Sequence, residues 1–144
     1  MYRNSEGYSD PTAGAAMGIM MREYREQQKI RWRRQYEMKH RPKIYVASRY
    51  AGDVEKNIAS AIRYCQYVIR HRGNPIASHL LYPQMLNDQI PEERELGLMF
   101  GLALLAVCDE VWCFGDVTGS EGVKLEIAEA KKLGKKIRFM KEAV

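Results

Sequence analysis

Cysteine is scarce in this sequence of 144 residues, which has three copies, Cys65, Cys108 and Cys113. They form no CxxC pair and have no histidine partner at metal-ligand spacing, which excludes a disulfide framework and a cysteine-based metal site. Their apolar surroundings instead predict reduced thiols in the core of a cytoplasmic protein. Long apolar runs are absent too, because residues 19–21 (Ile-Met-Met) are too few, and too closely followed by charge, for a signal peptide or a membrane span.

Two phosphate-binding signatures are also missing. No G-x-x-x-x-G-K-[ST] loop occurs, and no G-x-G-x-x-G follows the first predicted strand. ATP hydrolysis and ordinary dinucleotide binding are therefore not expected. No cluster of side chains in the sequence indicates a metal or a cofactor, and we expect neither.

Negative charge is in short supply at the N-terminal end. Residues 1–42 carry nine Lys and Arg against five Asp and Glu, a net charge of +4, whereas the other 102 residues carry fourteen against thirteen. The body of the chain is thus almost neutral, which argues against a nucleic-acid-binding domain. Only the N-terminal segment has the charge to contact nucleic acid.

The N-terminal segment is expected to form an arm outside the main domain. Residues 1–14 are polar, with Gly, Pro and Ser, and indicate an irregular leader. Residues 15–40 favour a helix, and Pro42 ends it. The apolar stripe of this helix is thin, so the helix either packs loosely on the domain, mediates self-association or contacts nucleic acid through its arginines. We therefore divide the chain into an arm, residues 1–42, and a domain, residues 43–144.

Four short apolar runs alternate with helical patterns in the domain. The predicted strands are Lys43–Ala47, Pro75–Ser78, Glu110–Phe114 and Lys136–Met140. The predicted helices run from the N-cap Asp53 to Gly73, from Pro91 to about Val107, and from Ser120 to Gly134. This alternation predicts an α/β fold, a Rossmann-like parallel sheet flanked by helices on both faces and preceded by the helical arm. In such sheets, ligands bind beyond the carboxyl ends of the strands.

The most informative stretch follows the third predicted strand. There, residues 115–119 form a turn and the sequence SEGVKLE, Ser120 to Glu126, begins a helix. Free backbone N–H groups at such a helix start bind phosphate. Glu126 lies more than one turn further in, where a carboxylate is a candidate nucleophile. The simpler alternatives are that Ser120 is only an N-cap and that Glu126 is a solvated residue paired with lysines.

Further candidates gather at the same edge of the sheet. Tyr45, on the first strand, is a candidate catalytic residue, although a core tyrosine is the simpler interpretation. His79 follows the second strand as a candidate proton donor or as a brace for the loop. Arg49 offers phosphate a bidentate partner. The predicted phosphate- and nucleotide-binding residues are Ser48, Arg49, Tyr50, Arg94, Asp116, Ser120, Glu121 and Gly122.

Three motifs resemble the nucleoside 2-deoxyribosyltransferase-like superfamily: S-x-G-V-x-x-E at residues 120–126, CDEVW at 108–112 and IYVAS at 44–48. Deoxynucleoside monophosphate N-glycosidases within it carry a similar S-x-G-x-x-x-E signature. The resemblance spans residues 43–140. The patterns IYVASxYAGD, HLLYP, PEERELG and CDE, with the leader EGYSDPTAGAA, are similar to a phage- and prophage-associated branch. This similarity implies that the protein is located in the cytoplasm of a bacterium that carries a phage or prophage.

The resemblance implies chemistry at a glycosidic bond. In the superfamily, the Glu matching Glu126 attacks the anomeric carbon of the sugar, and the resulting ester passes to another base or to water. The residues matching Ser120 and Gly122 hold a 5′-phosphate in nucleotide-specific members, and Tyr45 matches a tyrosine near the nucleophile. Members commonly complete the site across a subunit interface, so the resemblance implies a homo-oligomer.

One position departs from the superfamily. Its enzymes carry an Asp on the preceding helix, eight residues before the residue that matches Asp109, and Gly101 stands there instead. Arg94 and Glu95 lie about two turns earlier and do not match that position. The small Gly101 opens room for a larger ligand, and the proton donor would have to be His79 or Glu95.

Two functions are therefore weighed for the domain. The first is an enzyme that acts on the N-glycosidic bond of a nucleoside or nucleotide, with Glu126, Tyr45, His79 and Glu95 as its catalytic residues. The second is a non-catalytic nucleotide-binding module, either a sensor or a phage-encoded protein that sequesters a nucleotide signal. The second explains the missing Asp. A third function, nucleic-acid binding, concerns the arm alone.

Overall fold

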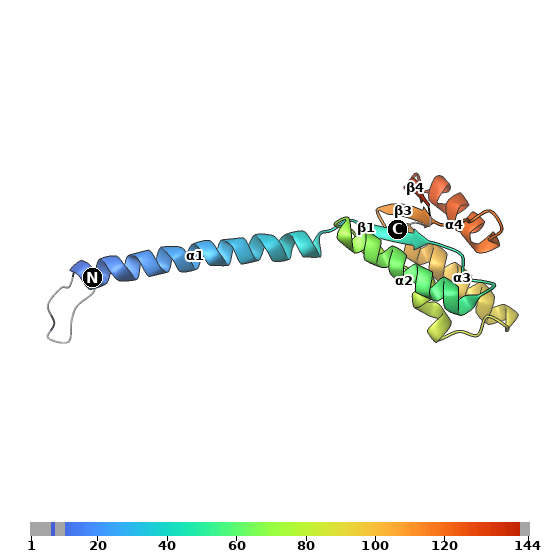
Figure 1. Cartoon of the computed structure of the whole chain (residues 1–144), viewed down its shortest axis with the longest axis horizontal. Helices are drawn as coiled ribbons and strands as arrows, with labels where there is room; N and C mark the ends of the chain where they lie inside the picture. The colour runs from blue at the N-terminus through green and yellow to red at the C-terminus, as the bar shows by residue number, and fades with distance from the viewer. Residues whose placement is uncertain (1–6, 8–10, 142–144) are drawn as a thin grey trace. The chain divides into compact units, whose positions relative to one another are not determined.

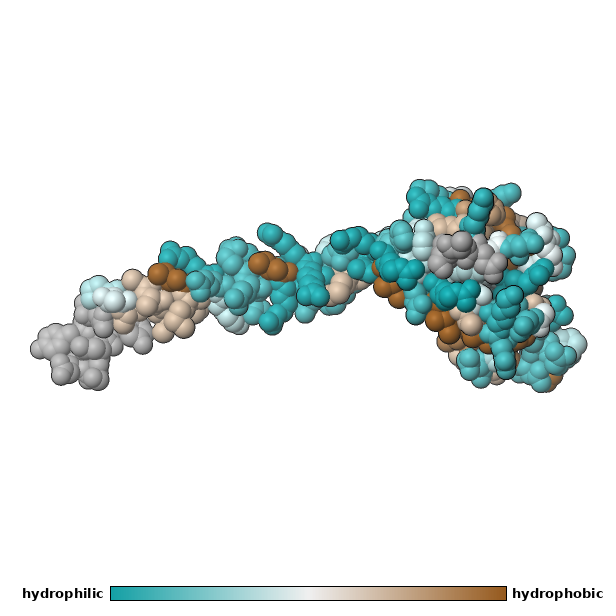
Figure 2. Space-filling model, in the orientation of Figure 1, coloured by the Kyte–Doolittle hydropathy of each residue, from teal (hydrophilic) through white to brown (hydrophobic). Residues whose placement is uncertain are grey.

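The computed structural model describes residue 7 and residues 11–141. The chain divides into two units, residues 1–40 and residues 41–144. The first unit contains helix α1 (Pro11–Lys39), which begins four residues before the predicted start because proline is compatible with the first turn of a helix (Figure 1). None of the 29 residues of this described helix is buried. Its surface is mostly hydrophilic with isolated apolar side chains (Figure 2).

The second unit is built on a four-stranded parallel sheet with strand order β2-β1-β3-β4. The strands are β1 (Lys43–Ala47), β2 (Asn74–Ile76), β3 (Glu110–Phe114) and β4 (Lys136–Met140). Three of them have the predicted bounds. The second is shorter than predicted because Ser78 begins a 3-10 helix. The predicted α/β fold class is confirmed.

Helices cover both faces of this sheet. Helix α2 (Val54–Arg70) packs on one face, and helices α3 (Pro91–Ala106) and α4 (Glu121–Lys132) pack on the other. Two 3-10 helices, η1 (Ser78–Leu80) and η2 (Tyr82–Gln84), lie between β2 and α3. All connections from one strand to the next therefore cross over through helices, as parallel pairing requires.

The central strand β1 shows how the core is divided. Ile44 and Val46 belong to the cluster beneath α2, whereas Tyr45 and Ala47 belong to the cluster beneath α3 and α4. All four are buried, and a strand that is covered on both faces is apolar throughout for this reason. The alternation places the side chain of Tyr45 on the same face of the sheet as Glu126 of α4.

Most helix ends follow the predicted signals. The carboxylate of Asp53 accepts a hydrogen bond from the Lys56 N–H at 3.2 Å, which caps α2. Pro91 is the first residue of α3. After α4, Gly134 adopts a φ of +69°, a left-handed conformation that terminates a helix. All three signals can be predicted from the sequence because each depends on residues that are neighbours in the chain.

The predicted end of α2 at Gly73 is wrong. The helix ends at Arg70, and Arg72 takes the left-handed conformation with a φ of +62°. Gly73 is needed for a different reason, since a Cβ atom there would lie 2.6 Å from Cγ1 of Val68 and 2.9 Å from Cγ1 of Ile44. The glycine therefore allows a close approach in the core rather than a turn of the backbone.

The structure also bears on two predictions made from composition, the state of the cysteines and the absence of a membrane span. Cys108 and Cys113 are buried and Cys65 is half-buried, and all three are free thiols. Burial raises the pKa of each thiol, to about 11 for Cys65 and Cys108 and to about 12 for Cys113, so none is a reactive thiolate. Within the described ranges, no helix combines the length and the apolar character needed to cross a membrane.

Candidate functional site

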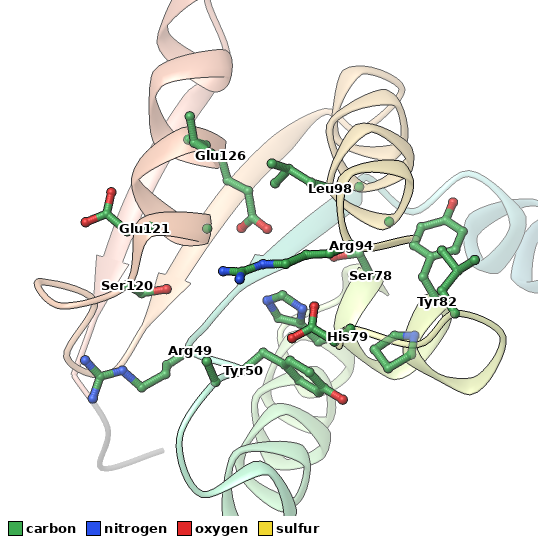
Figure 3. A pocket seen from close by; sticks show the side chains of 18 of the residues that line it. Arg49, Tyr50, Ser78, His79, Tyr82, Arg94, Leu98, Ser120, Glu121 and Glu126 are labelled. Atoms are coloured by element: carbon green, nitrogen blue, oxygen red, sulfur yellow. The ribbon is translucent and has the colours of Figure 1, made fainter. Parts of the chain in front are cut away.

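A cavity of about 540 Å³ lies at the carboxyl edge of the sheet. Its walls come from the segment after β1 (residues 49–52), the segment between β2 and α3, one face of α3, and the start of α4 (residues 119–122) (Figure 3). The cavity is therefore where the topology predicts a ligand site. Its volume is within the range of small-molecule sites, about 300–1,000 Å³.

Glu126 faces this cavity from α4 although it is almost wholly buried, with 3% of its surface exposed. Its Oε1 accepts a hydrogen bond from Tyr45 Oη at 3.1 Å, and its Oε2 is buried without a hydrogen-bond partner among the described residues. Desolvation raises the pKa of Glu126 to about 8, while the bond from Tyr45 acts in the opposite direction. The alternative that Glu126 is a solvated helix residue is wrong.

Tyr45 does not line the cavity itself but links two polar residues that do. Its hydroxyl is 3.1 Å from Oε1 of Glu126 and 2.8 Å from Oγ of Ser78. Desolvation and the charge of Glu126 raise the pKa of Tyr45 well above its usual value, so the phenol keeps its proton and donates a hydrogen bond to Glu126. Ser78 was not predicted as a site residue. The sequence signal that was available is its position directly after β2, at the carboxyl edge of the sheet.

The start of α4 presents backbone N–H groups to the cavity. Ser120 Oγ accepts a hydrogen bond from the Val123 N–H at 3.3 Å, which leaves the N–H groups of Glu121 and Gly122 without helical acceptors. A Cβ atom on Gly122 would meet nothing within 4 Å, so this residue borders open space. The side chain of Glu121 pairs with Lys124 at 3.3 Å and points away from the cavity (Figure 3). Glu121 thus contributes its backbone only.

Two arginines reach the cavity from different elements. Arg94 projects from α3 into its centre (Figure 3). Arg49 extends from the end of β1 toward the loop after β3, where its guanidinium packs against Gly119. A side chain at position 119 would collide with that guanidinium. The two guanidinium groups and the backbone donors of α4 favour an anion near the start of α4, although the acidic residues Asp88 and Glu93 also line the cavity.

An aromatic pair forms another part of the wall. The rings of Tyr50 and His79 are stacked with centroids 5.2 Å apart and an interplanar angle of 20° (Figure 3). Burial lowers the pKa of His79, partly offset by a hydrogen bond to the backbone of Ser48 and by Asp88. His79 is therefore mostly neutral at neutral pH. The pair presents a flat surface of the kind on which a planar ring stacks.

Glu95 does not take part in the cavity. It is exposed, and its neighbours Glu93 and Arg94 line the wall in its place. The face of α3 turned to the cavity consists of Glu93, Arg94, Gly97, Leu98 and Gly101. Successive residues on a helix are about 100° apart, so Glu95 points away from that face.

Two predicted phosphate ligands, Ser48 and Asp116, line a separate cavity of about 280 Å³ instead. Asp116 Oδ1 accepts hydrogen bonds from Thr118 N–H at 3.1 Å and from Thr118 Oγ1 at 2.7 Å. These bonds, with the charge of Arg49, lower the pKa of Asp116. These two bonds tie the carboxylate to the loop after β3.

Gly101 faces the Tyr45–Ser78 pair. A Cβ atom at this position would lie 3.4 Å from Ser78 Oγ and 3.5 Å from Tyr45 Oη, which are ordinary contact distances. A small side chain would therefore fit, and its absence enlarges the cavity next to Glu126. Within the described part of the chain, no group of three or more His, Cys, Asp or Glu side chains is arranged to hold a metal ion.

The parallel sheet, covered on both faces and with its cavity at the carboxyl edge, defines the domain as a Rossmann-like α/β protein. Residues 42–140 match the model of the family described as "Domain of unknown function (DUF7768)". The match covers more than half of the chain, and the chain belongs to the DUF7768 family. None of the curated proteins matches it.

The solved structures that are similar to the chain include two nucleoside-related enzymes. A 2-deoxyribosyltransferase from Bacillus psychrosaccharolyticus superposes with a TM-score of 0.57 and 17% identity, covering 69% of this chain and 72% of that chain. The CMP N-glycosidase BcmB from Clostridium botulinum gives a TM-score of 0.45 and 16% identity, covering 69% and 68%. The first of these similarities shows that the two proteins share a fold.

Proposed function

We propose that the domain binds a nucleotide in the larger cavity and cleaves its N-glycosidic bond, with Glu126 as the nucleophile. The observation that carries this proposal is the buried carboxyl of Glu126, which borders the cavity and is held by Tyr45 while its second oxygen has no partner in the described structure. Burying a carboxyl costs free energy, and such a group in a cavity is a typical functional residue.

The walls of the cavity fit the parts of a nucleotide. The phosphate would lie at the start of α4, where Ser120, Gly122 and the two arginines supply donors and positive charge. The base would stack on the Tyr50–His79 pair. The sugar between them would then lie next to Glu126. The fold shared with a 2-deoxyribosyltransferase supports this assignment.

The proposed reaction has two steps. In the first, a carboxylate oxygen of Glu126 attacks the anomeric carbon as the C–N bond breaks, and the electron pair of that bond leaves with the base, which takes up a proton. In the second, water attacks the anomeric carbon of the glycosyl ester, which releases the sugar phosphate and restores the carboxylate. The Tyr45 hydroxyl stabilises the carboxylate whenever it is released as the leaving group.

His79 is the proposed proton donor, because Glu95 does not reach the cavity. The donor must be the imidazolium form, and burial lowers the pKa of His79 from its usual 6.5. The nucleophile must be ionised, and the pKa of Glu126 is about 8. Because the pKa of the acid lies below that of the base, the reactive combination is a minor state of the empty protein at every pH.

This order of pKa values favours a second candidate function, in which the domain holds a nucleotide without cleaving it. Gly101, which stands where the superfamily has an acid, supports this alternative because the cavity next to Glu126 is then larger and less acidic. The protein would then serve as a sensor or as a phage-encoded protein that sequesters a nucleotide signal. Both candidates require the same phosphate and base contacts.

One experiment separates the two candidates. Wild-type protein is incubated with ribo- and deoxyribonucleosides and their 5′-monophosphates, and free base and intact ligand are quantified by chromatography. Base release that is lost in Glu126→Gln and kept in Glu129→Gln, a half-buried acid on the same helix outside the cavity, supports the enzyme. Micromolar binding of a ligand recovered intact, lost in Arg94→Ala, supports the binding module. Neither binding nor release across the panel would contradict both.

We also propose that the domain forms a homo-oligomer through α3. Leu96, Met99, Phe100 and Val107 are exposed on this helix or directly after it, and an exposed apolar face of this kind marks an interface. Light scattering after size exclusion should then give a multiple of the chain mass for wild type. Met99→Glu should shift the protein toward monomer, whereas Leu133→Glu, at an exposed position after α4, should not. A wild-type monomer would contradict the proposal.

A further inference from the structure

The smaller cavity, of about 280 Å³, lies beside the larger one at the carboxyl edge of the sheet. Its polar wall consists of Ser48, Asp53, Lys56, Asn57, Ser60 and Asp116. These residues come from the end of β1, the first two turns of α2 and the loop after β3. None of them except Ser48 is close in sequence to Glu126 or Tyr45, and none lines the larger cavity.

The two cavities share one wall. Arg49, Ala51 and Gly52 line both of them, so the cavities are neighbours separated only by this short segment. Asn57 Nδ2 donates hydrogen bonds of 3.0 Å to the carbonyl oxygens of Tyr50 and Ala51, which fixes the segment to α2. Arg49 is an exposed side chain on this wall, and it lines both cavities.

Ser48 gives independent evidence for a ligand in the smaller cavity. The residue is 3% exposed and lines the cavity, and its hydroxyl is buried without a hydrogen-bond partner among the described residues. A buried hydroxyl without a partner is costly, and such groups are rare in folded proteins. A polar ligand group in the cavity would satisfy it.

The charges of the wall indicate which kind of group this is. Arg49 and Lys56 are balanced by Asp53 and Asp116, so the lining has no net charge and does not favour a second anion. The two carboxylates use Oδ1 for hydrogen bonds with the backbone of Lys56 and Thr118, so Oδ2 of each can accept from a ligand. With the hydroxyl of Ser48 and that of Ser60, the wall suits a neutral group with several hydroxyls.

We infer that the two cavities form one bipartite site, whose ligand is a nucleotide carrying a neutral sugar on the far side of its phosphates. The nucleotide part lies in the larger cavity, the sugar in the smaller one, and the phosphates cross the shared wall at Arg49. The smaller cavity is below the size range of sites for whole small molecules, which suits a single ring better than a second nucleotide. This inference rests on nucleotide binding as proposed above.

The test compares matched ligands by isothermal titration calorimetry on the full chain. The probes are AMP, ADP and ADP-ribose, UMP, UDP and UDP-glucose, and GMP, GDP and GDP-mannose. In at least one series, the sugar-bearing ligand should bind at least about tenfold more tightly than both the mono- and the diphosphate. The diphosphates separate the effect of the sugar from that of added charge.

Two variants test whether the tighter binding of the sugar-bearing ligand depends on the smaller cavity. Ser48→Ala and Lys56→Gln should each remove most of the advantage of the sugar-bearing ligand while leaving monophosphate affinity within about twofold of wild type. Glu55→Gln, an exposed neighbour that lines neither cavity, should keep the advantage. Equal affinity for the monophosphate and the sugar-bearing ligand in all series, or an advantage that survives both variants, would overturn the inference and leave the proposed function intact. Failure of every probe to bind would instead overturn nucleotide binding.

Discussion

The hydroxyl of Tyr45 donates a hydrogen bond of 3.1 Å to Oε1 of Glu126, and both side chains are almost wholly buried. The bond joins the central strand to helix α4 across 81 positions of the sequence. It stabilises the ionised form of a carboxyl whose desolvation favours the neutral form, so the pKa of Glu126 is raised to about 8 and not further. The pair is the chemical centre of the candidate site.

Because the pKa of Glu126 is raised in the folded protein, this residue should lower the stability of the fold as pH rises. In the unfolded chain this carboxyl ionises near its ordinary pKa of 4.5, whereas the folded protein keeps the proton up to about pH 8. Stability should therefore fall between pH 5 and pH 8 and level off above. Glu126→Gln should melt progressively higher than wild type as pH rises, by several degrees at pH 8, as measured by thermal unfolding.

The other titrating groups are the same in wild type and in Glu126→Gln, so their effects on the melting temperature cancel when the two proteins are compared. Glu129→Gln on the same helix is the matched control for the loss of a carboxyl outside the cavity. A constant difference between Glu126→Gln and wild type from pH 5 to pH 8 would show that Glu126 is ionised in the folded protein.

Removal of the Tyr45 hydroxyl should lower the fraction of Glu126 that is ionised, and it also removes the hydrogen-bond partner of Ser78. Tyr45→Phe keeps the ring in the core and removes the donor to Glu126, so the pKa of Glu126 should rise further. A hydrogen bond to a charged group is worth about 1.5–3 kcal/mol, so base release should fall by about tenfold or more. The rate should also require a higher pH. Tyr67→Phe, on the opposite face of the sheet, should leave both properties unchanged.

An acid at position 101 should increase turnover. A Cβ atom there makes only ordinary contacts with Ser78 and Tyr45, so Gly101→Asp is expected to fold. Its carboxyl would face the cavity beside Glu126, and general acid catalysis contributes about 10²–10⁴-fold. Base release by Gly101→Asp should exceed that of wild type by at least about tenfold. Gly101→Ala controls for the added volume, and equal rates for the two variants would reject the role of the acid.

Gly119 is predicted to act through Arg49. Gly119→Ala places a methyl group where the guanidinium of Arg49 packs, so this flexible side chain must move. Nucleotide affinity should fall about as much as in Arg49→Ala, and the double variant should be no weaker than either single one. Calorimetry of the four proteins measures this coupling. Additive losses would show that the two residues act independently.

The arm is predicted to be dispensable for the site. The chain divides after residue 40, and all residues that line either cavity belong to the second unit. A protein that begins at Arg41 should keep a cooperative thermal transition and bind the same nucleotides with unchanged affinity. Loss of binding on truncation would show that the arm contributes to the site or to its assembly.

The fold was largely predictable because its signals are local. The strands β1 and β3 are apolar runs that are buried on both faces of the sheet, and their bounds, like those of the edge strand β4, were predicted correctly. The cap at Asp53 depends on its own neighbours in sequence. The close approach that Gly73 allows was not predictable, since it depends on Ile44 in strand β1, 29 positions away.

The site was predictable only in part. The helix start at Ser120 and the position of Glu126 follow from strand, turn and helix in sequence, but the burial of Glu126 depends on how α4 packs over Tyr45. Glu95 lies on the correct helix, but whether it faces the cavity depends on the rotation of α3, which the sequence alone does not fix. Ser48 and Asp116 were assigned to a single phosphate site because their loops share one edge, and the structure separates them into a second cavity.

The central claim is that Glu126 bonds covalently to the sugar of a nucleotide. The most direct test is mass spectrometry of the intact protein and of its proteolytic peptides, after acid quenching of the protein with each 5′-monophosphate. Wild type should gain the mass of the sugar phosphate without the base, on a peptide that contains Glu126, and Glu126→Gln should gain nothing. Base release by Glu126→Gln at the wild-type rate, or an adduct on another residue, would contradict the claim.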